Sequence, residues 1–282
     1  MSCDRHTLTA TLIACLLLAA SPPSIADNIP FPKTSYEVIG KADALPEQPV
    51  AALFVLMDET TKLNQHAKAH RAVQEMTANW MVSGRAVQVI RFSAYVPGRE
   101  AEIVTGGRLD PEPSDDFIDG MKRSERGKFN KLHKQQVYAA KKQTTAAIRH
   151  VFKQYSTSIP KSEILFNMHR LAEHIRKYKA ERKVILLVSD MLENSSVTSF
   201  YVAGRIRKIN PQAELTKVQR KKLIGDFGGN VTVHIIGLGY GAKEYLDSDR
   251  LTELKLFWQQ YFEMSNAKVV EMGAPLLYRP LE

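Results

Sequence analysis

Runs of consecutive apolar residues mark the strands of this chain. The three strongest runs lie at residues 50–57, 183–189 and 231–236. Strands have this composition when helices cover them on both faces, as in a parallel sheet. Weaker strand patterns follow at residues 86–95, 101–107 and 267–271. The run at residues 101–107 is predicted to be an edge strand.

Between these strands, apolar residues recur at helical spacing. The predicted helices cover residues 65–83, about 122–155, 162–178, 210–229 and 248–262. Ser162 is expected to cap the third helix, Asn210 before Pro211 to begin the fourth, and Gly228-Gly229 to end it. Strands and helices therefore alternate along the chain. This order predicts an α/β fold, an open, mostly parallel, Rossmann-like sheet of about six strands with helices on both faces.

The first 26 residues have the composition of a cleaved secretory signal. Arg5 precedes an apolar run at residues 7–20, and the small residues Ser24 and Ala26 follow it. The run is too short to span a bilayer comfortably, and the small residues predict cleavage after Ala26. An alternative is a lipoprotein signal with the chain anchored at Cys15. Either way the protein is predicted to be exported, with the periplasm as its compartment.

The rest of the chain is predicted to form one domain. Residues 27–49 contain four prolines and are predicted to be an extended lead-in, and residues 50–282 form the α/β domain. No segment after residue 26 has 18 consecutive apolar residues, so no transmembrane helix is predicted in the mature chain. Both cysteines, Cys3 and Cys15, lie within the signal. The domain must therefore rely on its apolar core and not on disulfides.

Charge is distributed unevenly along the chain. The 282 residues carry 39 Lys and Arg against 30 Asp and Glu, a net charge of +9, with 44% hydrophobic residues. This composition is typical of a globular protein and excludes disordered and collagen-like classes. A charged insertion is predicted at about residues 108–155. Its first part, residues 108–127, is acidic, contains prolines and is predicted to be an exposed loop.

The second part of the insertion, residues 122–153, carries ten Lys and Arg but one acid, Glu125. These basic residues are predicted to decorate a helix. Either they are solvated, or they bind an anionic surface such as phospholipid headgroups, nucleic acid or an acidic partner. The candidate anion-binding residues are Lys122, Arg123, Arg126, Lys128, Lys131, Lys134, Lys141 and Lys142.

Two acidic residues follow buried strands. Asp58 ends the run at residues 50–57, and Asp190 follows the run at residues 183–189. In open α/β sheets, sites form beyond the carboxyl ends of the strands where the strand order reverses. Two carboxylates gathered at this edge would repel unless a cation or an ammonium lies between them. The alternative is that each Asp caps a helix or fixes a turn.

These residues and the order of elements resemble the von Willebrand factor A (vWA) family. Asp58-Glu59-Thr60-Thr61-Lys62 is similar to its Asp-x-Ser/Thr-x-Ser motif, Ser162 lies where the family has a metal-ligating Thr, and Ser189-Asp190-Met191 stands for its Thr-Asp-Gly motif. The resemblance covers about residues 50–275. It implies that Mg²⁺ or Mn²⁺ binds in a degenerate metal-ion-dependent adhesion site formed by Asp58, Thr60, Ser162 and Asp190.

Lys62 departs from the family's motif, because a protonated lysine cannot ligate a metal. Either Lys62 points away and Thr61 or water replaces the missing hydroxyl, or its ammonium neutralises Asp58 and Asp190 without a metal. Lys62 and Ser189 are therefore predicted to contribute to binding beside the metal ligands.

The resemblance implies an exported, non-catalytic protein-binding module. It would dock a protein partner at the carboxyl edge of the sheet, in a cell-envelope assembly. One alternative is a metal-dependent hydrolase that uses Asp58 and Asp190 as ligands. Another is an anion-binding envelope protein that acts through residues 122–153.

Overall fold

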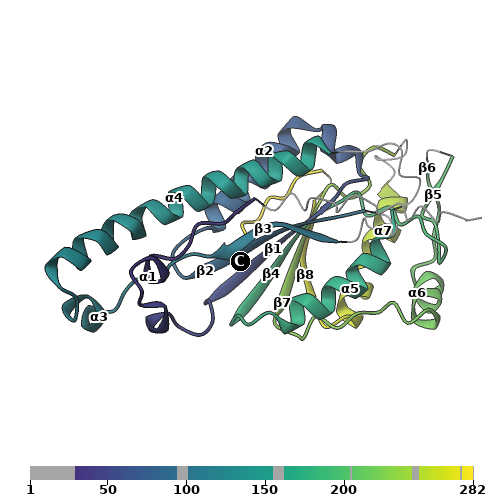
Figure 1. The fold of residues 1–282 in the computed structure, drawn as a ribbon. Helices are drawn as coiled ribbons and strands as arrows, with labels where there is room; N and C mark the ends of the chain where they lie inside the picture. The colour runs from purple at the N-terminus through teal and green to yellow at the C-terminus, as the bar shows by residue number, and fades with distance from the viewer. Residues whose placement is uncertain are drawn as a thin grey trace, which may run out of the picture.

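Six strands form one sheet in the computed structural model, which describes residues 29–93, 101–154, 162–203, 205–242, 248–273 and 275–281 (Figure 1). The strands are β1 (Ala51–Asp58), β2 (Arg85–Phe92), β3 (Glu102–Arg108), β4 (Arg182–Val188), β7 (Val231–Ile236) and β8 (Lys268–Gly273). Their order is β3-β2-β1-β4-β7-β8. The edge strand β3 runs antiparallel to β2, and the other neighbours are parallel.

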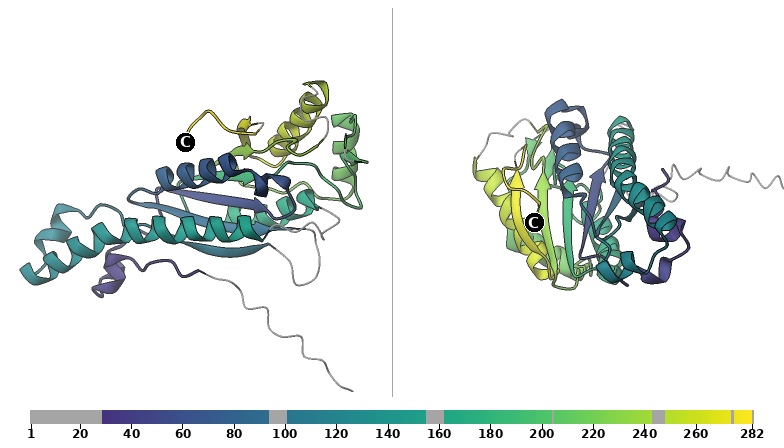
Figure 2. Two further views of the ribbon diagram at one scale, coloured as in Figure 1. Left: turned by 90° about the horizontal axis from the view of Figure 1, so that it is seen from above. Right: turned by 90° about the vertical axis from the view of Figure 1, so that its left-hand side faces the viewer.

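Helices cover both faces of this sheet (Figure 2). On one face, α2 (Ala67–Trp80) and α4 (Arg123–Lys153) pack against Leu53, Val55 and Met57 of β1. On the other face, Ala52, Phe54 and Leu56 contribute to a core with α5 (Ile164–Lys177), α6 (Pro211–Arg220) and α7 (Ser248–Met264). Alternate residues of β1 thus enter two different cores, which explains why the whole strand is apolar.

The predicted fold class and the predicted strands are confirmed, with boundary shifts of a few residues. The charged insertion differs from its prediction. Residues 108–127 are not simply an exposed loop, because they include α3 (Asp115–Asp119) and a buried Asp110. Asp110 accepts hydrogen bonds from the backbone N–H and the hydroxyl of Ser35. Through these hydrogen bonds, the buried carboxylate of Asp110 joins the insertion to the lead-in.

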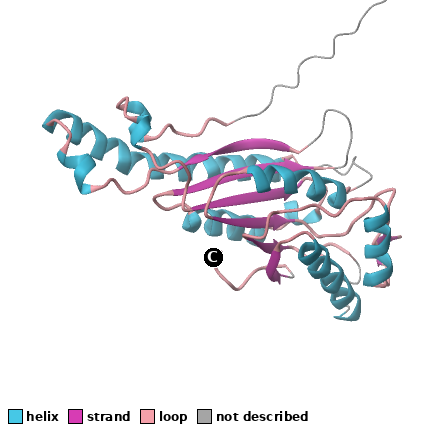
Figure 3. Cartoon of the chain, turned by 90° about the horizontal axis from the view of Figure 1, so that it is seen from below, coloured by secondary structure: helices cyan, strands magenta, loops and turns pink. Residues whose placement is uncertain are grey.

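The lead-in also contains more structure than an extended segment would. It includes α1 (Ser35–Val38), which Thr34 and Glu37 close with a capping box, and the 3₁₀ turn η1 (Ala42–Ala44). Tyr36 of α1 packs against Phe129 of α4, and Met121 joins them in a small separate core. This contact lies where α4 projects past the sheet, as Figure 3 shows from below.

Two predicted helix boundaries are wrong. Asn210 does cap α6, since its side chain accepts a hydrogen bond from the N–H of Ala213, but the helix ends at Arg220, well before Gly228-Gly229. Helix α5 begins at Ile164 with Glu163 as its N-cap residue, so Ser162 does not cap it.

The remaining elements are the 3₁₀ turn η2 (Lys62–Gln65) and a small hairpin of β5 (Tyr201–Val202) and β6 (Arg205–Ile206). Within the residues that the structure describes, no helix has both the length and the apolar composition needed to cross a bilayer. The predicted signal, residues 1–26, and its cysteines lie outside the described residues.

Candidate functional site

The strand order reverses between β1 and β4, which are neighbours in the middle of the sheet. From β1 the chain proceeds to β2 and β3 on one side, and from β4 it proceeds to β7 and β8 on the other. Asp58 is the last residue of β1, and Asp190 follows β4 by two residues. Both carboxylates therefore lie at the edge where open α/β sheets form their sites.

Asp58 is buried, with 1% of its surface exposed, and hydroxyl groups surround it. One of its oxygens accepts hydrogen bonds from the N–H (2.8 Å) and hydroxyl (2.6 Å) of Thr60. The other accepts a hydrogen bond from the Ser189 hydroxyl at 2.8 Å. Burial raises the pKa of Asp58, and these hydrogen bonds offset that rise only in part, because their donors are uncharged.

Ser189 holds the ends of β1 and β4 together. While its hydroxyl donates to Asp58, the hydroxyl oxygen accepts the N–H of Met191 at 3.0 Å. Met191 has a φ of 60°, a left-handed conformation that non-glycine residues adopt at some energetic cost. This strained backbone lies directly after Asp190. The family pattern has glycine at this position, which would adopt the same φ without strain.

Asp190 is partly exposed at the surface beside Asp58. Its carboxylate accepts a hydrogen bond from the N–H of Leu192 at 2.9 Å, and the Thr61 side chain also donates to it. Burial, and then repulsion from Asp58, raise the pKa of Asp190 to about 7, although the Lys62 ammonium opposes this rise. The pair therefore has less positive charge nearby than two ionised carboxylates require.

Lys62 is exposed and lies at the same edge. Its ammonium donates a hydrogen bond to the carbonyl of Gly241 at 3.3 Å, and it is close enough to Asp190 to lower that pKa. The ammonium thus neither leaves the site nor forms an ion pair with a carboxylate in the described structure. Neither alternative from the sequence describes Lys62 fully, because it stays near Asp190 but does not pair with either carboxylate.

The loop that receives Lys62 was not predicted as part of the site. It follows β7 and contains Gly237, Gly239 and Gly241, all with positive φ. The Gly239 N–H donates to the backbone carbonyl of Asp190 at 2.8 Å, and a Cβ on Gly241 would lie 2.8 Å from the Lys62 side chain. The glycines therefore allow this loop to pack closely against both residues. The repeated Gly-x-Gly-x-Gly pattern was the sequence signal for it.

Ser162 is not brought into contact with the carboxylate pair. Its hydroxyl donates to the carbonyl of Leu192 at 2.8 Å, and its backbone forms a β-bridge with Asn194. The buried Glu193 instead serves the start of α5, because its carboxylate accepts the N–H of Leu165 at 3.0 Å. Burial raises the pKa of Glu193 to about 8. Sequence reasoning missed this contact, since Glu193 and Leu165 are 28 residues apart.

The donors at this edge suit a hard divalent cation in their chemistry. Asp58, Thr60 and Asp190 offer oxygen atoms, which Mg²⁺ and Mn²⁺ prefer, and the raised pKa values of the two carboxyls indicate a shortage of positive charge. Among the described residues, no cluster of three or more His, Cys, Asp and Glu side chains could hold a metal. A cation here would therefore depend on two carboxylates, hydroxyls and water.

The basic residues of the insertion lie away from this edge. Helix α4 begins beyond the far end of the sheet, next to α1 and α3 (Figure 1). Arg126 forms an ion pair with Asp119 of α3 at 3.4 Å, and Lys141 is partly buried. The other candidates are exposed, namely Lys122, Arg123, Lys128, Lys131, Lys134 and Lys142. The two predicted binding surfaces are thus separate.

Comparisons with known proteins give likenesses of fold. No protein-family model matches the chain, and no curated protein matches it. Solved structures that resemble it include the following three. The first is proximal thread matrix protein 1 from the mussel byssus, with a TM-score of 0.36 and 11% identity. This likeness covers 81% of this chain and 42% of the mussel protein. The second is the pilus adhesin SpaC from Lactobacillus rhamnosus GG, with a TM-score of 0.40 and 13% identity. This likeness covers 82% of this chain and 29% of the adhesin chain. The third is the TFIIH p34 N-terminal domain, with a TM-score of 0.35 and 11% identity. This likeness covers 80% of this chain and 93% of the p34 chain.

The chain therefore spans less than half of the mussel and pilus proteins, and most of the p34 domain. At these identities and TM-scores, the likenesses carry no argument about function, which must rest on the site.

Proposed function

We propose that this chain is a protein-binding module that docks a partner at the carboxyl edge of its sheet, around Asp58, Asp190 and Lys62. The observation that carries the proposal is the electrostatic state of this edge. Two carboxyls with raised pKa values lie beside an exposed ammonium, so the edge can bind cations and anions of a partner.

The residues have different parts in this proposal. Buried Asp58 supplies a fixed negative group, while the partly exposed Asp190 and Thr60 are accessible from outside. Asp58, Thr60 and Asp190 would hold a Mg²⁺ or Mn²⁺ ion, which when bound would accept a carboxylate of the partner as a further ligand. Lys62 would contact the same partner carboxylate from the Gly241 side.

Binding is favoured over catalysis by the accessibility of the groups. The Ser189 hydroxyl is fully buried and donates to Asp58, so it is not placed to attack a substrate. The hydrolase alternative would have to use Asp190 as its general base, because Asp190 is the partly exposed carboxyl of the pair. The setting in the cell envelope rests on the signal predicted at residues 1–26.

The test is a pull-down from the envelope fraction of cells that produce the tagged full-length protein, with and without a chelator. Asp190→Asn removes the charge from the site and keeps the shape of the side chain. We expect it to reduce the captured partner at least tenfold, as truncation of an interface hot spot does. The exposed Asp43→Asn is the matched control and should capture the partner normally.

Partner capture that survives Asp190→Asn and Lys62→Ser would contradict docking at this edge. Hydrolytic activity of the purified protein that disappears in Asp190→Asn would support the hydrolase alternative.

A further inference from the structure

Helix α4 carries a row of basic side chains along one side, all of them exposed except the partly buried Lys141. At 3.6 residues per turn, the side chains of the row project within an arc of about 140°. We name this row the α4 stripe, and it consists of Lys128, Lys131, Lys134, Lys141, Lys142 and Arg149. The helix has 31 residues, so it is about 45 Å long, and the stripe extends over about 30 Å of that length.

The opposite side of the helix is fixed to the domain. Phe129, Gln136, Ala140, Ala147 and Val151 are buried there, against the lead-in at one end and the sheet at the other. Gln136 also connects α4 to the segment that follows β3. Its side-chain amide accepts a hydrogen bond from the N–H of Asp110 and donates one to the carbonyl of Arg108. The stripe is therefore held in a line, with its orientation set by the core.

The charges of the stripe are not neutralised within the described structure. Of the basic residues of α4, Arg126 forms an ion pair, with Asp119, and His133 approaches Asp110 and Glu112. Those contacts lie in the first third of the helix and involve no stripe residue. The ion pairs found among the described residues include none of the six stripe residues. The acidic α3 thus does not cancel the stripe.

Two observations favour a lipid surface as the anionic partner. First, Tyr138 is 73% exposed within the arc of the stripe, and an isolated tyrosine suits the headgroup region better than it suits base stacking. Second, the described chain begins at Ile29, which donates its N–H to Val104 of β3, on the flank that α4 covers (Figure 2). In the lipoprotein alternative, with the chain anchored at Cys15, the anchor thus precedes in sequence the flank that carries the stripe.

We propose that the α4 stripe docks the protein on the anionic headgroups of a lipid bilayer. The contact is electrostatic, with α4 lying along the bilayer surface, since the stripe offers five exposed cations, the partly buried Lys141 and one exposed aromatic ring. It is independent of the proposed partner site, which lies at the carboxyl edge of the sheet. A protein held in this way could present that edge to partners along the membrane.

The test is co-sedimentation of the full chain with vesicles of phosphatidylcholine alone or with about one third phosphatidylglycerol. The neutral vesicles report any binding through residues 7–20, and the difference between the two reports the stripe. A triple variant, Lys131→Gln, Lys134→Gln and Lys142→Gln, should lose about a hundredfold in affinity for anionic vesicles, at roughly fivefold per lysine. Binding of the wild type should weaken with added salt.

The matched control is Lys221→Gln, Lys255→Gln and Lys268→Gln, which removes the same charge from exposed positions after α6, in α7 and in β8. It should retain affinity within a few fold, and equal melting temperatures should show that both variants fold. Equal loss in both triple variants, or no loss in the stripe variant, would overturn the proposal. Retention on duplex DNA or on an acidic protein in place of vesicles would also overturn it.

Discussion

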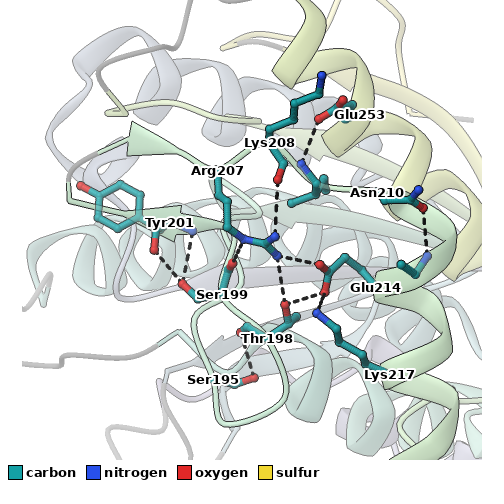
Figure 4. A network of polar contacts seen from close by, with 12 residues as sticks. Ser195, Thr198, Ser199, Tyr201, Arg207, Lys208, Asn210, Glu214, Lys217 and Glu253 are labelled. Atoms are coloured by element: carbon teal, nitrogen blue, oxygen red, sulfur yellow. Dashed lines mark hydrogen bonds and ion pairs between the residues drawn. The ribbon is translucent and has the colours of Figure 1, made fainter.

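Two groups of carboxylates in this protein differ in how far their neighbours compensate their charge. Glu214 of α6 is 3% exposed and accepts hydrogen bonds from Arg207 (2.7 Å), Lys217 (2.8 Å) and Thr198 (2.7 Å), as Figure 4 shows. Burial alone would raise the pKa of Glu214, but these partners together hold it below its usual range. At the carboxyl edge, burial prevails and the pKa values of Asp58 and Asp190 are raised.

The difference separates a structural cluster from a candidate site. The Glu214 cluster is complete in its charge balance, and it ties the segment after the β5–β6 hairpin to α6. The Asp58–Asp190 pair is held in place by hydroxyls, strained backbone and a glycine loop, at a cost in electrostatic energy. A protein gains nothing in stability from such a pair, and for this reason we place the proposed docking site there.

The largest effect is expected from breaking the complete cluster. Arg207→Leu leaves Glu214 buried with less compensation, and we expect the free energy of unfolding to fall by about 3 kcal/mol, the lower end for a buried pair because Lys217 remains. Urea denaturation measures this change. Arg220→Leu, at an exposed position on the same helix as Glu214, should change stability by less than about 0.5 kcal/mol. A loss equal to that of the control would mean that the cluster is not structural.

A smaller effect of opposite sign is expected at the carboxyl edge. The pKa of Asp190 is about 7 in the folded protein and 3.8 ordinarily, so the folded state binds more protons between these values. Its contribution to stability is therefore lost as pH rises from about 4 to about 7. Asp190→Asn should reduce this dependence, while the raised pKa of Glu193 keeps a slope of the same sign. The variant should also be more stable at pH 8 by about 2 kcal/mol, after allowance for solvent at the partly exposed side chain.

Melting curves between pH 4 and 8 measure this dependence. Glu214 serves as the internal contrast, because its lowered pKa stabilises the fold above its ordinary value of 4.5, and that stability is lost at lower pH. Glu214→Gln should flatten the acid side of the profile and leave the pH 4 to 7 slope intact. A wild-type profile that rises from pH 4 to 7 and follows Asp190 would contradict the raised pKa.

The central strands could be predicted from sequence because strands that are buried on both faces consist almost entirely of apolar residues. Burial on two faces makes β1, β4 and β7 continuously apolar, and the reversal of strand order then brings Asp58 and Asp190 together. Asn210 before Pro211 also predicted a helix start correctly, since both residues act locally.

Contacts between distant segments could not be predicted in this way. Asp110 lies in an acidic, proline-containing stretch that favours exposure, yet Ser35, 75 residues away, makes its burial possible. Ser162 is a residue type that often caps a helix or ligates a metal, but its hydroxyl donates a hydrogen bond to the carbonyl of Leu192. The positive φ of Met191 depends on the packing around it, and no local pattern of sequence indicates it.

The smallest effect tests which cation completes the carboxylate pair. Mg²⁺ at ten times its dissociation constant stabilises a folded state by about 1.4 kcal/mol, which raises the melting temperature of a domain of this size by about 4 °C. We expect Lys62→Ser to show this shift at lower Mg²⁺ than the wild type does at pH 8, because the ammonium beside Asp190 competes with the metal. Asp190→Asn should show no shift.

Ser162→Ala sharpens the same measurement. The resemblance to the vWA family predicts that Ser162 is a metal ligand, whereas in the structure its hydroxyl donates to the carbonyl of Leu192. In the Lys62→Ser background, Ser162→Ala should lower the melting temperature slightly and leave the Mg²⁺ shift unchanged. A shift that disappears with Ser162 would mean that the hydroxyl turns to the metal when it binds. Equal Mg²⁺ dependence of the wild type and Lys62→Ser would show that the ammonium does not compete, and that Lys62 serves the partner alone.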